Sequence, residues 1–294
     1  MREFLSAPVD PISIALFRML IGGVMLVYFF RNRSFFTAYY THSPFYFYYE
    51  WTPFIKPLNR FFMKVIFHLM VFFAFLFTLG FFYRFCAVVL FLMNTYVLLL
   101  DKTMYSNRAY LWSLFLFLFS FVDGAKVFSL DSFVWYSSSV EKWIPYWQLF
   151  IFKAQIGIVY FYGGVNQITF DRLFRAMPLR KVMKSFVWRK TNHYKNFKLF
   201  IHRRIAFFVE RLLQTTFFPY FISWLLTLLD LLIILPMFFE GIFYFALPIY
   251  FAYVFLDRVF YDYSKKYCEH YFFVVLFLNP EIFRSIFQSI EVYL

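Results

Sequence analysis

The sequence predicts an all-α integral membrane protein, a bundle of about seven or eight transmembrane helices with interfacial segments. Of the 294 residues, 63% are hydrophobic and 15% are charged, whereas soluble domains are about 45–50% apolar and about 25% charged. Several apolar runs approach the roughly 20 residues that a helix needs to cross a bilayer. These runs lack the period-two alternation of barrel strands, so helices are the structure expected to satisfy the backbone in lipid.

Eight apolar segments are the candidate spans of this bundle. The last of them is short and contains Asn279-Pro280, so it is the weakest. We found no internal repeats and no Gly/Ser-rich linkers, and we therefore expect a single domain over residues 1–294. The segments are 11–30, 62–82, 85–100, 105–122, 143–165, 217–239, 242–256 and 271–283.

Two polar stretches interrupt the apolar runs. Residues 31–60 are rich in aromatic side chains and contain three prolines, which favours an interfacial segment with its rings at headgroup depth over one unbroken helix. Residues 171–211 hold twelve Lys or Arg and two acids. Interleaved Phe and Trp residues there predict basic amphipathic helices that bind anionic headgroups or a protein partner, rather than nucleic acid. The cations expected to form that surface are Arg180, Lys181, Lys184, Arg189, Lys190, Lys195, Lys198, Arg203 and Arg204.

Ionisable residues inside the predicted spans require a partner or a purpose, because each costs about 2.5–3.5 kcal/mol at bilayer depth. One interpretation is a polar cavity between helices. The other, which we favour, is that Arg18 or Lys153 pairs with Asp230 and locks the bundle. The full set is Arg18, His68, Lys153 and Asp230, with Asp101 at the end of a span.

Recognisable catalytic and metal-binding patterns are missing from the sequence. No phosphate loop, nucleophile elbow or HExxH is present, and no two histidines are spaced as i, i+4 ligands on a helix. We therefore expect no metal site. Gly163-Gly164 predicts a tight turn or a close helix approach.

Two blocks of sequence resemble a known membrane family. The stretch YVLLLDKTMYSNRAYLWSLFLFLFSFVDGAKVFSLDSF (96–133) is similar to the signature of the vitamin K-dependent gamma-carboxylase membrane region, and WQLFIFKAQIGIVYFYGGVNQITFDRLFRAMPL (147–179) is similar to its Tyr-Phe-x-x-Gly segment. Residues 16–23 and 225–232 agree more weakly. The chain is thus identified as a member of the HTTM (horizontally transferred transmembrane) superfamily, which also includes proteins of the sporulation-delaying protein B type.

The resemblance also implies where the chain departs from the carboxylases. The family's proposed base is a lysine after the Tyr-Phe-x-x-Gly stretch, where this sequence has Asn166-Gln167, and an amide cannot take a proton from vitamin K hydroquinone. The family's two histidines correspond to Arg108 and to the neighbourhood of Phe260. The lumenal domain that recognises propeptides has no counterpart in the 294 residues. We therefore expect a protein that does not carboxylate.

Three functional hypotheses remain open from the sequence. The first is a non-catalytic scaffold subunit of a larger membrane complex, without a cofactor. The excess of Phe (51) and Tyr (24) suggests an organellar coding bias and would suit the mitochondrial inner membrane, with a bacterial plasma membrane as the other choice. The second is partner-dependent maturation or export of a secreted peptide. The third is residual quinone chemistry, with a quinone or lipid in the bundle cavity near Tyr160, Tyr162 and Asp101.

The orientation in the membrane also stays open. With eight spans, one side receives 22 Lys or Arg residues and the other side receives five. The positive-inside rule then places both termini outside and the basic stretch inside. The carboxylase resemblance implies the opposite placement of the Gly163-Gly164 end.

Overall fold

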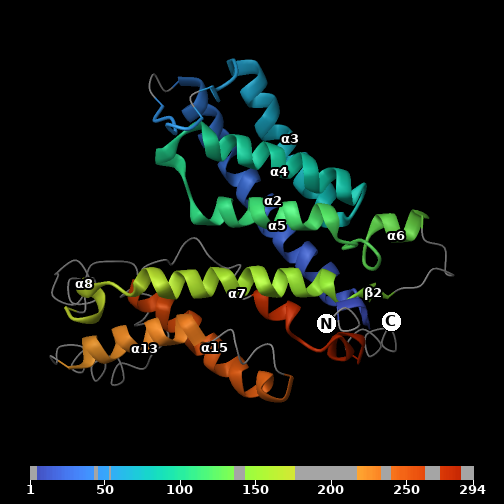
Figure 1. Ribbon diagram of the computed structural model, residues 1–294. Helices are drawn as coiled ribbons and strands as arrows, with labels where there is room; N and C mark the ends of the chain where they lie inside the picture. Colours follow the sequence, from blue (N-terminus) through green and yellow to red (C-terminus); the bar gives the residue numbers. More distant parts are fainter. Residues whose placement is uncertain are drawn as a thin grey trace, which may run out of the picture. The chain divides into compact units, whose positions relative to one another are not determined.

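The computed structural model describes residues 5–42, 46–52, 54–135, 143–175, 217–232, 240–261 and 272–285, and these are mostly helical (Figure 1). The chain divides into two compact units. One unit is Met1–Lys153 together with Phe272–Leu294, and the other is Ala154–Tyr271. The basic cations predicted between Arg180 and Arg204 lie outside the described residues.

The first unit is built on four helices that pack in chain order. They are α2 (Ile12–His42), α3 (Arg60–Leu79), α4 (Tyr83–Leu100) and α5 (Asn107–Phe121), with α2 against α3, α3 against α4 and α4 against α5. A buried cluster of Phe rings joins α2 and α5 to residue 152: Phe17 lies 5.2 Å from Phe115 and 5.9 Å from Phe119, and Phe119 lies 4.5 Å from Phe152. Each such pair adds about 0.5–1.5 kcal/mol beyond its buried area. Aromatic packing therefore stabilises this unit.

Three helices of the described residues are long and apolar enough to cross a membrane. They are α2 from Ile12 to Thr41, α3 and α4. They coincide with the first three predicted spans. The fourth, α5, is a helix of 15 residues, about 22 Å long. The fifth is α7 (Trp147–Gln167). It is long enough to cross a membrane, but it is not apolar enough to count among the three candidate spans.

The later part of the chain differs more from the predicted bundle. Shorter apolar helical stretches occur at Tyr220–Leu229 within α13 (Phe218–Leu232) and at Tyr244–Val254 within α15 (Glu240–Tyr261). The eighth predicted span, 271–283, is not a continuous helix in its described part. A short 3-10 turn, η2 (Val274–Leu276), occupies it, and Asn279-Pro280 begins a new helical turn. Proline removes a backbone donor and clashes with the preceding turn, which explains the break.

The predicted interfacial segment 31–60 begins later than expected. Helix α2 continues without interruption through residues 31–42 and ends at His42. No proline or glycine occurs between Arg31 and His42, so nothing in that stretch stops a helix, and Pro44 is the first breaker. The irregular part described here is confined to residues 46–52 and 54–59.

A small antiparallel pairing was not predicted. Strand β1 (Pro8–Val9) pairs with β2 (Ile144–Pro145), with Val9 opposite Ile144. The pairing ties the start of α2 to the start of α7, and Asp10 caps α2 by accepting a hydrogen bond from the Ile12 backbone N–H at 3.0 Å. Arg284 forms an ion pair of 2.6 Å with the same carboxylate. The N-terminal and C-terminal parts of the first unit are thereby joined.

The second unit contains the end of α7, α8 (Phe170–Leu173), α13 and α15. Tyr160 and Tyr250 are buried and their hydroxyl oxygens lie 2.8 Å apart. A Cβ on Gly164 would lie 2.8 Å from Leu231 Cγ, whereas one on Gly163 would meet nothing within 4 Å. The close helix approach predicted from the glycine pair is thus confirmed, and Gly164 makes it.

Candidate functional site

Helix α4 separates two polar regions of the first unit. Its 18 residues give a length of about 27 Å, close to the roughly 30 Å hydrocarbon core of a bilayer. As a candidate span, α4 would place its N-terminal end at Tyr83 and its C-terminal end at Asp101 on opposite faces of the membrane. We call them the Arg84 end and the Asp101 end.

The Asp101 end is organised by one buried carboxylate. Asp101 Oδ2 accepts a hydrogen bond from the Tyr39 hydroxyl at 2.6 Å, and Oδ1 accepts from the backbone N–H and the hydroxyl of Thr103, both at 2.8 Å. Burial on its own would raise the pKa of Asp101, but the hydrogen bonds from Tyr39 and Thr103 outweigh it and lower the pKa below its ordinary value. The carboxylate is therefore charged at neutral pH, and its proton-accepting oxygens are already occupied.

Tyrosines cover this carboxylate. The rings of Tyr40 and Tyr46 stack at 6.0 Å, and Tyr46 donates a hydrogen bond of 2.8 Å to the Tyr40 carbonyl. Burial raises the pKa of Tyr46 and of Tyr49, and Asp101 adds to the effect. These phenols stay protonated at physiological pH, so they can donate hydrogen bonds but cannot serve as bases.

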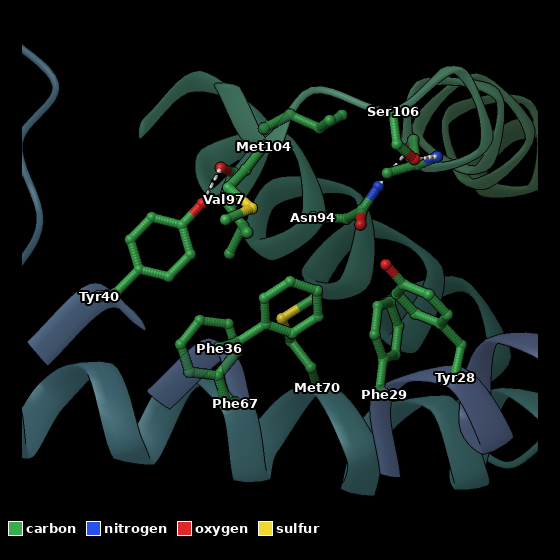
Figure 2. A pocket seen from close by; sticks show the side chains of 12 residues that line it. Tyr28, Phe29, Phe36, Tyr40, Phe67, Met70, Asn94, Val97, Met104 and Ser106 are labelled. Carbon is green, nitrogen blue, oxygen red and sulfur yellow. Dashed lines mark hydrogen bonds between the residues drawn. The ribbon is translucent and has the colours of Figure 1, made fainter. Parts of the chain in front are cut away.

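A small cavity lies beside this end, among α2, α3, α4 and the start of α5 (Figure 2). Its volume is about 30 Å³, which is about the space of one water molecule. Cavities that hold drug-sized or cofactor-sized ligands measure about 300–1,000 Å³. A quinone ring does not fit without displacing side chains. The lining is mostly apolar and aromatic, from Tyr28, Phe29, Phe36, Tyr40, Phe67 and Met70 on one side.

Arg108, where the sequence predicts the loss of a family histidine, lies next to this cavity. Its guanidinium carbon lies 5.5 Å from the centre of the Tyr28 ring and 5.6 Å from the centre of the Trp112 ring. A guanidinium has only N–H donors and no acceptor, so Arg108 cannot act as a general base. Its observed contacts are cation–π contacts that hold α5 against α2.

The Arg84 end is built around a second arginine, Arg18, which is fully buried. Its guanidinium donates to four backbone carbonyls: Phe77 at 2.7 Å, Thr78 at 3.0 Å, Gly124 at 3.0 Å and Phe128 at 2.6 Å. The first two are carbonyls of the last turn of α3, where the helical hydrogen-bond ladder ends; Phe77 also accepts the Gly80 backbone N–H at 3.1 Å. Arg18 thus joins α2 to the end of α3 and to the segment that follows α5.

A tight, strained turn connects α3 to α4 above Arg18. Gly80 ends α3 in the left-handed region at φ +70°, and a Cβ there would lie 2.4 Å from Arg18 Nη1. Phe82 also has a positive φ, +45°, which costs a non-glycine residue about 1–3 kcal/mol. Asp131 holds this conformation, because its two oxygens accept the Phe82 and Tyr83 backbone N–H groups, both at 2.9 Å. The turn leaves the Phe82 ring exposed at this end of α4.

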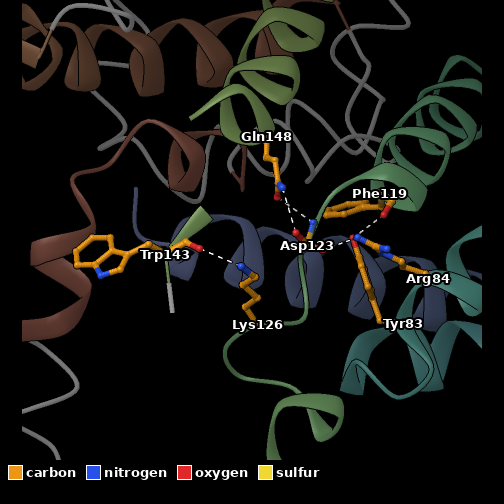
Figure 3. A network of polar contacts seen from close by, with 7 residues as sticks. All are labelled: Tyr83, Arg84, Phe119, Asp123, Lys126, Trp143 and Gln148. Atoms are coloured by element: carbon orange, nitrogen blue, oxygen red, sulfur yellow. Dashed lines mark hydrogen bonds and ion pairs between the residues drawn. The ribbon is translucent and has the colours of Figure 1, made fainter. Parts of the chain in front are cut away.

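A polar network surrounds that turn (Figure 3). Arg84 forms an ion pair with Asp123, and Asp123 exchanges two hydrogen bonds with the buried amide of Gln148, at 2.9 and 3.2 Å. Lys126 donates to the Trp143 carbonyl at 3.0 Å. The network links α4 and the segment after α5 to the start of α7.

An open cleft of about 430 Å³ lies at this end of α4. In contrast to the Asp101 end, it is large enough for a ligand. Two cations, two carboxylates and two exposed Phe rings contribute to its walls. The lining residues are Phe82, Tyr83, Arg84, Phe85, Asp123, Ala125, Lys126 and Asp131.

The polar residues predicted inside the spans do not gather in one cavity. Arg18 belongs to the Arg84 end, Asp101 lies at the opposite end of α4, and His68 is exposed on α3. Lys153 lies over the rings of Tyr146 and Phe277, at 5.7 and 5.2 Å. Among the described residues, Arg18, Asp101 and His68 therefore lie at separate places in the first unit. Backbone carbonyls satisfy Arg18 because α3 ends beside it.

Three further predicted positions have side chains outside the described residues. Gln167 ends α7, Asp230 lies in α13, and Phe260 lies in α15. The pairing of Arg18 or Lys153 with Asp230 therefore stays a prediction, and so does the loss of the family's catalytic residues. Among the described residues, no group of three His, Cys, Asp or Glu side chains could hold a metal ion.

Sequence reasoning missed the Arg84 end as a site. Arg84 and Lys126 were counted only as loop charges, and Asp131 was not singled out. The sequence signal for this end is the run Gly80-Phe81-Phe82-Tyr83-Arg84. Its glycine and its arginine mark the junction between two apolar segments. It marks a tight turn with an aromatic and a cation at the membrane face.

Three apolar helices of spanning length, with aromatic and charged side chains at their ends, define a helical membrane protein. A family model described as the HTTM domain matches residues 6–280. The chain belongs to the HTTM family, which confirms the resemblance to the gamma-carboxylase membrane region at the level of the family. No solved structure matches the chain.

Proposed function

We propose that this protein is a non-carboxylating HTTM scaffold that works as a subunit of a larger membrane complex. The observation that carries the proposal is a polar stripe on the outward face of α3, where the side chains of Lys64 and His68 are exposed within a predicted transmembrane helix. Such groups are costly against lipid and favour burial against protein.

On this proposal, His68 lies at hydrocarbon depth. It is the ninth residue of a 20-residue helix, about 12 Å from the start, so it cannot reach either interface as a terminal Lys can. Its Nδ1 lies 2.7 Å from the Lys64 carbonyl, which leaves Nε2 directed to the surroundings. A helix of another subunit that offers a hydroxyl or carboxyl group would satisfy that nitrogen.

The same face has a shape suited to a helix. An open apolar groove of about 370 Å³ runs along it. Side chains at i, i+3, i+4, i+7, i+8 and i+11 of α3 line the groove, which is the spacing of one helix face. These side chains are Phe61, Lys64, Val65, His68, Leu69 and Phe72.

The absence of carboxylation is supported by the Asp101 end. Its cavity of about 30 Å³ has no room for a quinone, and the nearby Arg108 cannot accept a proton. We extend the proposal to Gln167 and Phe260, whose side-chain types offer no base. On this account the protein needs no cofactor.

The basic stretch 171–211 is proposed as a second docking surface, for anionic headgroups or for other subunits. The aromatic coding bias fits the mitochondrial inner membrane, which we propose as the location. Both ideas depend on the sequence alone.

Purification of the full chain in a mild detergent, followed by native mass spectrometry, tests the proposal. The expected result is a stoichiometric assembly from which the variant His68→Leu is lost at least in part. The matched control is Leu92→Ala, which changes an exposed residue on the outward face of α4. If the His68 variant stays in the assembly as fully as the control does, α3 is not the face that docks another subunit. A chain that purifies alone would contradict the subunit role.

The two alternatives give different results in companion assays. Hydroquinone-dependent carboxylation by the unmodified chain would overturn the proposal, whereas activity that appears only in the double variant Gln167→Lys, Arg108→His would indicate a lapsed carboxylase. Co-purification with a small secreted peptide and its processing partner would favour peptide maturation.

A further inference from the structure

The Arg84 end offers more hydrogen-bond donors than its own acceptors use. Both oxygens of Asp131 accept backbone N–H groups of the α3–α4 turn. The oxygens of Asp123 accept from Arg84 and Gln148. The carboxylates that line the cleft are thus already engaged by the protein.

The two cations of the cleft are only partly engaged. Arg84 contacts Asp123 through Nη2 and its side chain is 61% exposed, although a guanidinium carries five N–H donors. Lys126 gives one hydrogen bond to the Trp143 carbonyl, although an ammonium carries three N–H donors. The remaining donors suit an anion with several oxygens.

The rim of the same cleft is apolar. Phe82 is 55% exposed and Phe85 is 60% exposed, and both line the cleft. Phe82 stands there in a left-handed backbone conformation that Asp131 maintains through two hydrogen bonds. A glycine would satisfy the turn without strain, so the geometry of the turn does not require the ring. An aromatic ring beside cations at the end of a spanning helix is suited to the boundary between headgroups and acyl chains.

We propose that this cleft binds the phosphate diester of a membrane phospholipid through Arg84 and Lys126, with the acyl chains along Phe82 and Phe85. The volume of about 430 Å³ accommodates a phosphoglycerol headgroup. The start of α4 lies at the depth where phosphates occur, because α4 has the length of the hydrocarbon core. This site is independent of the proposed subunit role and of the basic stretch 171–211.

The test uses the full chain in phosphatidylcholine nanodiscs that contain a photoactivatable phosphatidylglycerol, with the reactive group on an acyl chain next to the glycerol. After illumination, the cross-linked residues are mapped by mass spectrometry. We expect adducts on the α3–α4 turn near Phe82 and Phe85. Arg84→Gln and Lys126→Gln should each reduce the yield about fivefold, and the double variant should reduce it more than tenfold.

Two further variants keep the result interpretable. Lys102→Gln is the matched control, since Lys102 is a part-exposed cation paired with Glu50 at the opposite end of α4; its adduct yield should equal that of the unmodified protein. Phe82→Gly removes the ring and relieves the positive φ, so it should lower the yield about threefold without lowering the unfolding temperature.

The outcomes separate the sources of phosphate. Inorganic phosphate at millimolar concentration should not compete with the lipid. Competition by phosphate together with weak lipid adducts would replace the lipid by a free anion and overturn the proposal. Adducts that are absent from the turn, or equal in the Arg84, Lys126 and Lys102 variants, would overturn it as well.

Discussion

The two ends of helix α4 solve the problem of polar groups at a membrane face in opposite ways. At the Asp101 end, the Tyr39 hydroxyl and Thr103 bind one carboxylate, aromatic rings pack nearby, and the cavity that remains measures about 30 Å³. At the Arg84 end, a buried arginine holds a frame of backbone carbonyls, and a cleft of about 430 Å³ remains open. The closed end lies next to Arg108, where the sequence predicts the loss of a family histidine, whereas the open end has the room for a ligand.

The difference teaches that the residues that resemble a family signature need not be the residues that line the open cleft. The sequence block that resembles the carboxylase signature contains Asp101 and Arg108, yet these residues serve packing in the structure. The residues of the open end lie partly in the same block, at Asp123, Lys126 and Asp131, and the resemblance assigns them no role.

The largest expected effect is at the frame of the open end. Arg18→Leu removes the guanidinium donors to the Phe77, Thr78, Gly124 and Phe128 carbonyls. Phe77 keeps the backbone N–H of Gly80, but a buried acceptor that loses its partner is costly. We expect a loss of at least about 3 kcal/mol in the free energy of unfolding, measured by denaturation in detergent. A loss below about 0.5 kcal/mol, the usual limit for a surface substitution, would show that the frame does not depend on Arg18.

A smaller effect at the same end is expected from Gly80→Ala. The new Cβ would meet Arg18 Nη1 at 2.4 Å and would force a positive φ on alanine, which together cost about 2–3 kcal/mol. Gly23→Ala is the control within α2, because a Cβ there meets nothing within 4 Å and alanine favours the helix. Equal unfolding temperatures for the two variants would contradict the tight turn.

The closed end should respond to the loss of its carboxylate charge. Asp101→Asn weakens the hydrogen bonds from Tyr39 and Thr103, and we expect a loss of about 1–2 kcal/mol at neutral pH. Because the folded state lowers the pKa of Asp101, its contribution is complete above about pH 4 and disappears as the pH falls through the lowered value. Unfolding curves of the unmodified protein and of Asp101→Asn, recorded from pH 7 downward, should therefore converge at low pH. Parallel curves would show that the carboxylate is not stabilised by these bonds.

The sequence predicted the apolar helices better than the polar contacts. Long apolar runs such as those of α3 and α4 can be predicted from the local sequence alone, because a helix in lipid satisfies its backbone hydrogen bonds within its own segment. The exceptions have local causes: α2 runs on to His42 because no breaker precedes Pro44, and the last predicted span is broken at Asn279-Pro280.

The candidate sites could be predicted only in part, because their partners are distant in the chain. Arg18 was recognised as a costly charge, but its acceptors lie 59 to 110 residues away and are backbone groups, which leave no side-chain signature. Asp101 was expected at a membrane face and lies at the end of α4. Its hydroxyl partner Tyr39 could not be identified among 24 tyrosines. The sequence analysis grouped His68 with the other polar residues inside the spans. Its exposed position on α3 could not be predicted, because it depends on which face of α3 packs against α2.

One experiment tests the contrast between the two ends directly. The full chain is placed in nanodiscs with equal amounts of a photoactivatable phospholipid and a photoactivatable quinone, and the adducts of both are mapped on the same molecules. The account predicts phospholipid adducts around Phe82 and Arg84 and no quinone adducts between Met104 and Trp112. Quinone adducts on that segment, with an unlabelled α3–α4 turn, would contradict it.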